Sequence, residues 1–293
     1  MLEILPVLDS KERAEHCSHL LTRNRFELAE LAQDTLKITK KTKGYDFEGQ
    51  RVELKDLLEE NLQHKKSIPP EEKLELPKSP NFSVTKIQFV NETTLMTARR
   101  LMKEEKRALV LNFANGTNVG GGFLVGARAQ EETLCYASSL YMSLEGDPFY
   151  RYHRFKSIAS SNYAIVSETV VFRDDEYNLI REPWQMDVIT MAAPIAIRGV
   201  GVSKKKGAQL LDTRIERLYE IAASLGYEHL VLGAWGCGAF GNDPAAVSSL
   251  FRKHLEGRFT GCFSEVIFTI ADWSPERKFL HPFVQSFSTA TAH

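Results

Sequence analysis

From residue 84 onward, short apolar runs of strand length alternate with longer segments of helical periodicity. The runs are KIQFVN (86–91), ALVLNFAN (108–115), AIVSETVVF (164–172), DVITMAAPIAI (187–197), HLVLGAWG (229–236) and EVIFTIAD (265–272). The helical segments are 93–106, 132–144, 206–226, 243–256 and 275–286. Strands that are apolar at nearly every position are buried on both faces. We therefore expect an α/β/α sandwich around a largely parallel or mixed sheet.

The first 80 residues have a different pattern of apolar and charged residues. Residues 10–40 place leucines at helical spacing and predict a helix or a helix pair. KGYDFEGQRVE (43–53) predicts a small hairpin, and LKDLLEENL (54–62) predicts a short helix. Residues 64–80 hold four of the eleven prolines and many charges, which is typical of a connector. We expect N-terminal accessory helices and a hairpin over 1–80, and a larger α/β domain over 81–293.

Charge and cysteine usage exclude several classes of function. The formal net charge is −1, which disfavours sequence-independent nucleic-acid binding as the main activity. The N-terminus does not read as a secretory signal, and we expect no membrane span. The four cysteines form no CxxC pair, and the eight histidines form no HExxH motif. We expect reduced thiols, a cytoplasmic location and no bound metal.

Two glycine-rich stretches follow directly on two of the expected strands. ALVLNFAN leads into GTNVGGG, and HLVLGAWG leads into CGAFGNDP. Ligands of such sheets bind beyond the carboxyl ends of the strands. We therefore expect both stretches to face one cleft.

The second stretch, GAWGCGAFGNDP (233–244), is typical of an anion site. A glycine-rich turn that leads into a helix N-terminus directs several backbone N–H groups at one point. Asp243 and Pro244 suit the cap and first turn of that helix. The chain has no GxxxxGK[ST] motif, which disfavours a P-loop site. The glycine spacing of GCGAFG (236–241) comes late in the chain, which disfavours a dinucleotide site. Phe240 lies between glycines and is expected to contact the ligand, the alternative being a tight turn around a buried ring.

The first stretch, GGGFLVGARAQEE (120–132), brings three glycines close to two acids. A helix is expected to begin near Gln130 or Glu131, so both acids occupy its first turn. Adjacent helical residues point about 100° apart, so Glu131 and Glu132 cannot do the same job. The helix N-terminus stabilises a carboxylate, whereas a nearby diphosphate favours the protonated acid. That balance suits a group that donates a proton and then takes one back. Two ordinary N-terminal helix acids are the simpler alternative.

These stretches carry a resemblance to a known family. GGG, seven residues and then QEE resembles the signature of bacterial-type poly(ADP-ribose) glycohydrolases, which have a macrodomain fold. LNFANGTNVGGG, GAWGCGAFGNDP, and FRDDEYNLI followed by DVITMAAP resemble further parts of the same family. The match covers roughly residues 84–273, and the N-terminal helices and hairpin resemble the extension usual in that family. Val119 stands where the family often has proline, and Ile195 where it often has asparagine, which leaves the substrate preference open.

The resemblance implies a role for each matching residue. Glu132 matches the catalytic acid/base, and Glu131 matches the acid that holds the ribose of the scissile bond. The remaining ligand-binding positions are Asn115 and Asn118 for the distal ribose, Gly120, Gly121 and Gly122 for that ribose and the phosphate, Gln130 of the QEE motif, and Gly236, Cys237, Gly238, Ala239 and Phe240 for the diphosphate. Adenine is expected toward the start of the domain, with Glu92, Asp272 and Trp273 as candidates.

The implied reaction is hydrolysis of an O-glycosidic bond at the anomeric carbon of ADP-ribose. Protonated Glu132 would give its proton to the leaving ribose hydroxyl, and its carboxylate would then activate water, so a single acid handles protons. The implied partners are ADP-ribose, poly(ADP-ribose) and ADP-ribosylated proteins, with no membrane, no sequence-specific nucleic acid and no cofactor. We expect a monomer.

Three alternatives remain at this point. The same cleft would also serve a hydrolase of mono-ADP-ribosylated proteins. A non-catalytic ADP-ribose-binding module is a second alternative, against which the intact QEE argues. A hydrolase that uses Cys237 or Cys135 as its nucleophile is the third, although no histidine lies within several residues of either cysteine.

Overall fold

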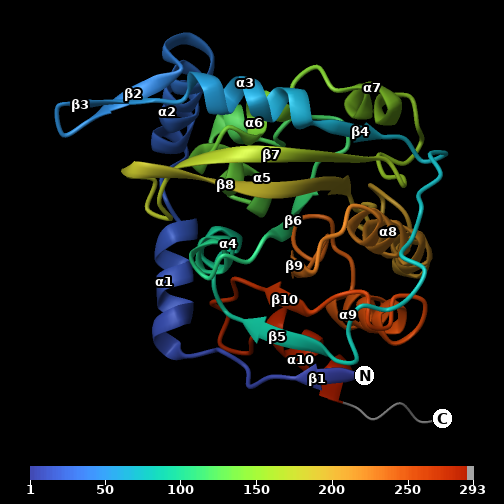
Figure 1. Cartoon of the computed structure of the whole chain (residues 1–293). Helices are drawn as coiled ribbons and strands as arrows, with labels where there is room; N and C mark the ends of the chain where they lie inside the picture. The colour runs from blue at the N-terminus through green and yellow to red at the C-terminus, as the bar shows by residue number, and fades with distance from the viewer. Residues whose placement is uncertain (289–293) are drawn as a thin grey trace.

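The computed structural model describes residues 1–288 and is built around one eight-stranded sheet (Figure 1). Across the sheet the strands follow the order β1 (Leu2–Ile4), β5 (Thr85–Val90), β10 (Glu265–Thr269), β9 (His229–Leu232), β6 (Ala108–Ala114), β8 (Leu179–Ala192), β7 (Ala164–Arg173) and β4 (Lys66–Ile68). The six strands from β1 to β8 are parallel, and β7 and β4 are each paired antiparallel to their neighbour. The predicted mixed sheet is confirmed.

Helices cover both faces of the sheet. One face packs against α8 (Lys204–Ser224), α9 (Pro244–Glu256) and α10 (Leu280–Ser288). The other packs against α4 (Thr94–Lys103), α5 (Gln130–Ala137), α6 (Leu140–Leu144) and α7 (Pro148–Arg154). Successive residues of β6 point alternately to these two layers: Leu109 and Leu111 to the first, Val110 to the second. The predicted α/β/α sandwich is therefore the observed architecture.

The N-terminal region packs along one side of the sandwich (Figure 1). It holds α1 (Lys11–Leu21), α2 (Arg25–Leu36), a π-helical turn η1 (Lys37–Thr42), the hairpin β2 (Gly44–Phe47) and β3 (Gln50–Glu53), and α3 (Lys55–His64). The predicted helix pair, hairpin and short helix are confirmed. A small third core joins Tyr45 and Leu58 from this region to Val170 and Phe172 of β7.

Three local predictions were wrong. Residues 66–68 were expected to lie in a connector and instead form β4, an edge strand of the main sheet. The single helix expected over 132–144 is two helices, α5 and α6, separated by Ser138 in extended conformation. The sequence analysis also missed α7, whose first turn is capped by Asp147 and begins with Pro148. Each of these elements is too short for its periodicity to be recognised in the sequence. Strand pairing or helix capping in the folded protein determines its conformation instead.

The glycine loops follow β6 and β9, as predicted. β6 and β9 are parallel neighbours, so their carboxyl ends meet at the same edge of the sheet. The Asp243 side chain accepts a hydrogen bond from the Ala246 N–H, and Pro244 occupies the first turn of α9. The predicted helix cap after the second glycine loop is thereby confirmed.

The aromatic cluster around β10 is where we expect a substitution to lower the stability of the fold most. Phe268 is fully buried and contacts four rings, those of Phe89, Phe251, Phe283 and Phe287, at centroid distances of 5.3, 5.3, 5.7 and 5.4 Å. We expect Phe268→Ala to lower the free energy of unfolding by about 3–5 kcal/mol in urea titrations, because it leaves a cavity in the core. Phe26→Ala, at an 83% exposed ring, should change it by less than about 0.5 kcal/mol. Equal losses for the two variants would contradict the assignment of the core.

Candidate active site

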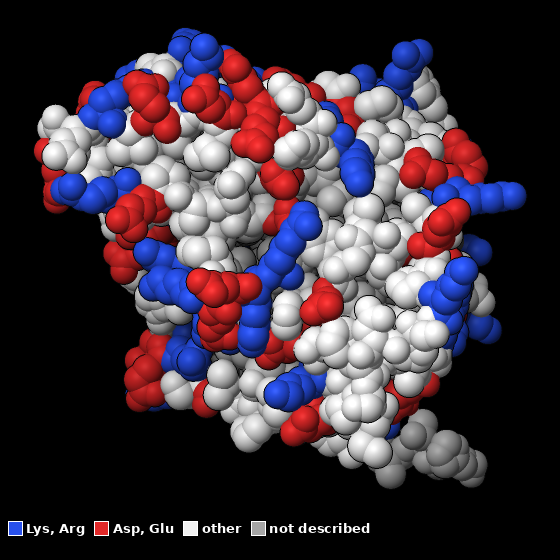
Figure 2. Space-filling model, viewed as in Figure 1, with Lys and Arg blue, Asp and Glu red and all other residues white. Residues whose placement is uncertain are grey.

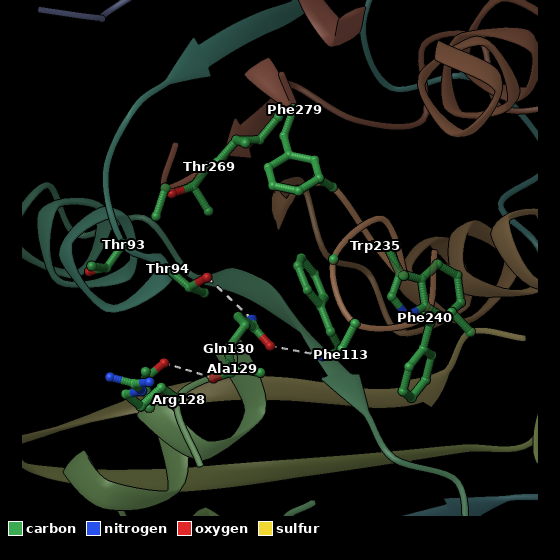
Figure 3. A pocket seen from close by; sticks show the side chains of 18 of the residues that line it. Thr93, Thr94, Phe113, Arg128, Ala129, Gln130, Trp235, Phe240, Thr269 and Phe279 are labelled. Atoms are coloured by element: carbon green, nitrogen blue, oxygen red, sulfur yellow. Dashed lines mark hydrogen bonds between the residues drawn. The ribbon is translucent and has the colours of Figure 1, made fainter. Parts of the chain in front are cut away.

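The start of α5 is fixed to β6 by Gln130. Its Oε1 accepts a hydrogen bond from the Phe113 N–H at 2.9 Å, and its Nε2 donates to the Leu111 carbonyl at 2.8 Å and to Thr94 Oγ1 at 3.2 Å. Figure 3 shows the contacts of Gln130 with Phe113 and Thr94 beside a cavity. Both amide protons of Gln130 are used within the protein. Gln130 therefore lines the site while its polar atoms hold the helix on the strand.

Glu131 points beneath the first glycine loop and is 2% exposed. Its Oε2 accepts a hydrogen bond from the Asn115 N–H at 2.8 Å, and its Oε1 accepts one from Asn112 Nδ2 at 3.3 Å. Burial raises the pKa of Glu131 to about 8, against the lowering effect of the Asn115 hydrogen bond and with a further rise from the charge of Glu132. The side chain is therefore protonated at neutral pH.

Glu132 lies next to the glycine loop rather than beneath it. Its Oε1 accepts a hydrogen bond from the Gly122 N–H at 2.7 Å. Its Oε2 is buried and has no hydrogen-bond partner among the described residues. A buried carboxylate oxygen without a partner is costly to the fold, and this oxygen keeps its full capacity to accept a hydrogen bond from a ligand. The two acids are unequal, as the sequence predicted.

The first glycine loop is shaped by close backbone approach. Gly120 and Gly121 have φ values of +61° and +59°, which disfavour any residue with a side chain. A Cβ at Gly121 would overlap Glu132 Oε1 and lie 3.0 Å from Glu131 Oε2. A Cβ at Gly122 would lie 2.6 Å from the Ala127 Cβ. The bare backbone therefore lies directly against both carboxyl groups.

Asn115 and Asn118 have different positions in this loop. Asn115 Oδ1 accepts hydrogen bonds from the Thr117 and Asn118 N–H groups, each at 2.9 Å, and closes the turn after β6. The Asn118 side chain is exposed, and its carbonyl accepts the Gly121 N–H. Asn115 thus shapes the loop with its oxygen, and Asn118 lies at the solvent side.

The second glycine loop is held from below by Asn242. Asn242 Nδ2 donates to the Pro194 carbonyl at 2.8 Å and to the Gly236 carbonyl at 3.0 Å. Gly236 has a φ of +73°, whereas Gly238 and Ala239 are exposed, with open space where a Gly238 Cβ would lie. The Cys237 thiol is buried in the core below the loop. Cys237 can therefore offer a ligand only its backbone.

A cavity of about 260 Å³ lies between the second glycine loop, the start of α5 and the ends of β5, β6 and β10. Its walls include Phe113, Phe240 and Phe279, whose rings appear in Figure 3, together with Thr94, Gly236, Gly238 and Ala239. The lining is mainly apolar with a few polar groups, as expected for a site that binds an aromatic ring and a polar tail. Gln130 and Thr133 also line it, so Glu131 and Glu132 lie beside it.

The three residues expected to contact adenine differ in their positions and partners. Glu92 lines the cavity, and its carboxylate is paired with Arg13 at 2.8 Å and with Arg100 at 3.3 Å. Trp273 also lines the cavity. Asp272 is buried, and its carboxylate accepts the Phe279 and Leu280 N–H groups at 2.7 and 3.2 Å. Asp272 therefore positions Phe279 at the cavity.

Sequence reasoning missed four residues of this site: Asn112, Thr94, Phe113 and Phe279. Asn112 lies in the middle of β6, and a lone polar residue in an apolar strand was the available signal. Thr94 and Phe113 resemble ordinary cap and strand residues, and Phe279 comes more than 150 residues after the first glycine loop. Only the folded chain brings Thr94, Phe113 and Phe279 to one cavity and Asn112 to Glu131 beside it.

Neither candidate cysteine is suited to act as a nucleophile. Cys135 and Cys237 are both buried, and burial raises the pKa of each thiol well above its usual range. The thiolate required for nucleophilic attack is therefore strongly disfavoured at neutral pH. This argues against the Cys-dependent alternative.

Residues 1–288 contain no group of three or more His, Cys, Asp and Glu side chains placed to hold a metal ion. In the same part of the chain, no helix is both long enough and apolar enough to cross a membrane.

Comparisons with known proteins agree with this geometry. Residues 32–174 match the family model described as the catalytic domain of microbial-type PARG. The poly(ADP-ribose) glycohydrolase of Thermomonospora curvata is 34% identical, with a TM-score of 0.80 over 90% of this chain and 100% of that one. Its complex with the inhibitor ADP-HPD aligns equally well, over 89% of this chain and 99% of that one, at 34% identity and a TM-score of 0.80.

The Deinococcus radiodurans poly(ADP-ribose) glycohydrolase, in complex with ADP-ribose, is 36% identical and has a TM-score of 0.72. That alignment covers 78% of this chain and 96% of the other. No curated protein sequence matches the chain.

The glycine loop makes a first prediction for the site. Gly121→Ala should abolish turnover and weaken ligand binding, because the added Cβ overlaps Glu132 Oε1 and the φ of +59° is unfavourable for alanine. Gly146→Ala, at a φ of +75° with open space around it, is the matched control for backbone strain. Calorimetric titration and unfolding curves would separate the two effects. Full ligand affinity in Gly121→Ala would contradict the close approach described above.

The buried Glu131 makes a prediction about pH. Its pKa is about 8 in the folded protein and ordinary in the unfolded chain, so between about pH 4.5 and 8 the folded state binds more protons. Stability should therefore fall as pH rises through this window, by roughly 3–5 kcal/mol in total. Glu131→Gln removes the titration, so its unfolding free energy should decline less than that of the wild type. Parallel pH–stability curves for the two proteins would contradict the assignment.

Proposed function

The chain belongs to the microbial-type poly(ADP-ribose) glycohydrolases, and we propose that it hydrolyses the ribose–ribose O-glycosidic bonds of poly(ADP-ribose) to release ADP-ribose. The observation that carries this proposal is the state of Glu132. One of its carboxylate oxygens is fixed by the Gly122 N–H, and the other is buried without a partner among the described residues, beside the cavity.

The site accommodates ADP-ribose in one direction. The apolar cavity beside Phe279 and Trp273 suits the adenosine end, and the open backbone of Gly236–Phe240 suits the diphosphate. The distal ribose then lies over Gly120–Gly122, next to Glu132. Phe240 packs on the ligand between these two parts. This order follows the sheet edge from β5 and β10 through β9 to β6.

Glu132 acts as the acid and then as the base. Its free oxygen protonates the leaving ribose hydroxyl, and the oxocarbenium-like sugar that forms is stabilised by the nearby diphosphate. The resulting Glu132 carboxylate activates water for attack at the anomeric carbon. A second opposed carboxylate, as in ordinary glycosidases, is not needed because the diphosphate supplies negative charge next to the sugar.

Glu131 holds the site in place. Each of its oxygens already accepts one hydrogen bond, from Asn115 or Asn112, and each retains a lone pair for a ribose hydroxyl. Three assignments stay predictions. They are the binding of a ribose by Glu131, the binding of the distal ribose by Asn115 and Asn118, and the existence of the protein as a cytoplasmic monomer. The hydrolysis of mono-ADP-ribosylated proteins in the same cleft is an alternative that substrate comparison separates.

The decisive variant is Glu132→Gln. We expect it to lower the rate of ADP-ribose release from poly(ADP-ribose) by at least about 10³-fold, because an amide cannot transfer the proton. Affinity for free ADP-ribose should stay within a few-fold, since the amide oxygen still accepts the Gly122 N–H. Glu145→Gln, which removes an exposed acid paired with Lys40, is the matched control and should retain activity. Wild-type turnover by Glu132→Gln would refute the assignment.

A further inference from the structure

Two segments of the chain are basic and contain no acid at all. Residues 148–167 and 188–211 together hold seven Lys and Arg residues and no Asp or Glu, in a chain whose net charge is −1. The seven are Arg151, Arg154, Lys156, Arg198, Lys204, Lys205 and Lys206, and we call them the basic rim. All seven are exposed. None forms an ion pair with any residue from 1 to 288, whereas Lys40, Lys253 and Arg258 each do.

Both segments lie at the edge of the sheet that carries the site. Ser160 Oγ donates to the carbonyl of Ala192, the last residue of β8, at 2.8 Å. A Cβ on Gly116 would overlap the Ala159 carbonyl oxygen, so the loop after α7 lies against the loop after β6. The Ala196 N–H donates to the Phe240 carbonyl at 2.7 Å. The two segments thus flank both glycine loops.

The first segment also contacts α8, the helix that begins within the second segment. Arg214 of α8 donates from Nη2 to the Ser160 carbonyl at 3.0 Å and from Nε to Ser160 Oγ at 3.2 Å. Burial lowers the pKa of Arg214, and the neighbouring group that opposes this lowering is Tyr152 rather than a carboxylate. An arginine without an acidic partner therefore joins the loop after α7 to α8. The basic rim is one surface, formed by two segments that α8 holds together.

Sheet order sets the direction in which this surface extends the site. The cavity lies over β5, β10 and β9, and the two acids lie over β6. The next strands along the sheet are β8 and β7, whose ends at this edge carry the basic rim. ADP-ribose bound with its adenosine in the cavity therefore presents its reacting bond toward the rim. What lies beyond that bond is the leaving group.

We propose that the basic rim binds the part of poly(ADP-ribose) beyond the scissile bond, with cations on the diphosphates of the leaving units and Phe155 on an adenine. This inference rests on the proposed function and adds a second binding surface to it. Each leaving unit carries a diphosphate, and a row of unpaired cations is the surface that such a chain requires. Phe155 is 80% exposed and stands between Arg154 and Lys156. An exposed ring flanked by cations is the arrangement on which single-stranded nucleic acids stack their bases.

The experiment compares polymer with free ADP-ribose. The rim variant carries Arg198→Gln, Lys204→Gln, Lys205→Gln and Lys206→Gln. The matched control carries Lys37→Gln, Lys55→Gln, Lys86→Gln and Lys103→Gln, which removes four exposed lysines, unpaired within residues 1–288, from other elements. The readouts are KM for poly(ADP-ribose), its dependence on salt, and Kd for end-labelled polymer and for free ADP-ribose.

We expect the rim variant to raise the polymer KM and Kd about tenfold near 0.1 M salt and to reduce the salt slope by about 1 to 3. Its kcat and its Kd for free ADP-ribose should stay within about twofold of wild type, because the rim does not contact the bound unit. Phe155→Ser should raise the polymer KM without changing the salt slope, since stacking releases no counterions. The control variant should leave all of these values close to wild type.

Several results would overturn the proposal. A rim variant with wild-type polymer affinity and salt slope would do so, as would equal losses in the rim and control variants. If a single-stranded RNA with the same number of phosphates displaces the polymer equally well, the rim is a general polyanion surface and the assignment to poly(ADP-ribose) is wrong. Failure of the wild type to release ADP-ribose would refute the proposed function instead, and the binding measurements would still test the rim.

Discussion

Three consecutive side chains at the start of α5 bind the backbone that precedes them, and the site depends on this attachment. Gln130 pairs with the Phe113 N–H and the Leu111 carbonyl of β6, Glu131 with the Asn115 N–H, and Glu132 with the Gly122 N–H. Successive residues of a helix point in different directions. One turn of helix therefore holds a strand, the turn after it and the glycine loop at once, and fixes all three relative to the acids.

The two buried acids of this attachment lower the stability of the folded protein. Glu131 is buried with a pKa raised to about 8, and Glu132 Oε2 is buried without a partner among the described residues. Neither feature stabilises the folded chain, since buried polar groups favour folding only when they are fully hydrogen-bonded. The surrounding core compensates for them, through the aromatic cluster around Phe268 and the layers of helices on both faces of the sheet. Unfavourable groups of this kind, gathered at the ligand-binding edge of a well-packed sheet, are expected of a functional site.

The N-terminal region contacts the loop that leads to the two acids. A Cβ on Gly126 would overlap the Arg25 carbonyl oxygen, and Arg128 Nη1 donates to the Arg23 carbonyl at 3.2 Å. Thr35 Oγ1 of α2 donates to the Tyr136 carbonyl of α5 at 3.0 Å. The beginning of α2 therefore packs directly on the loop between the glycines and the acids. The division of the chain at residue 80 stays a prediction, and β1 and β4 show that both of its sides contribute to one sheet.

The sequence by itself determined the layers, the two glycine loops and the unequal acids. Periodicity reports which faces of strands and helices are buried, and GGG-x7-QEE specifies a loop and the helix turn that follows it, because these are local properties of the chain. Only the tertiary structure decided that Gln130 is used internally, that the Cys237 thiol faces the core, and that Phe279 and Asn112 join the site. It also decided that two acid-free segments meet along the same edge as the acids, where Ser160 donates to the Ala192 carbonyl. These facts depend on which distant residues come into contact, and no local pattern encodes that choice.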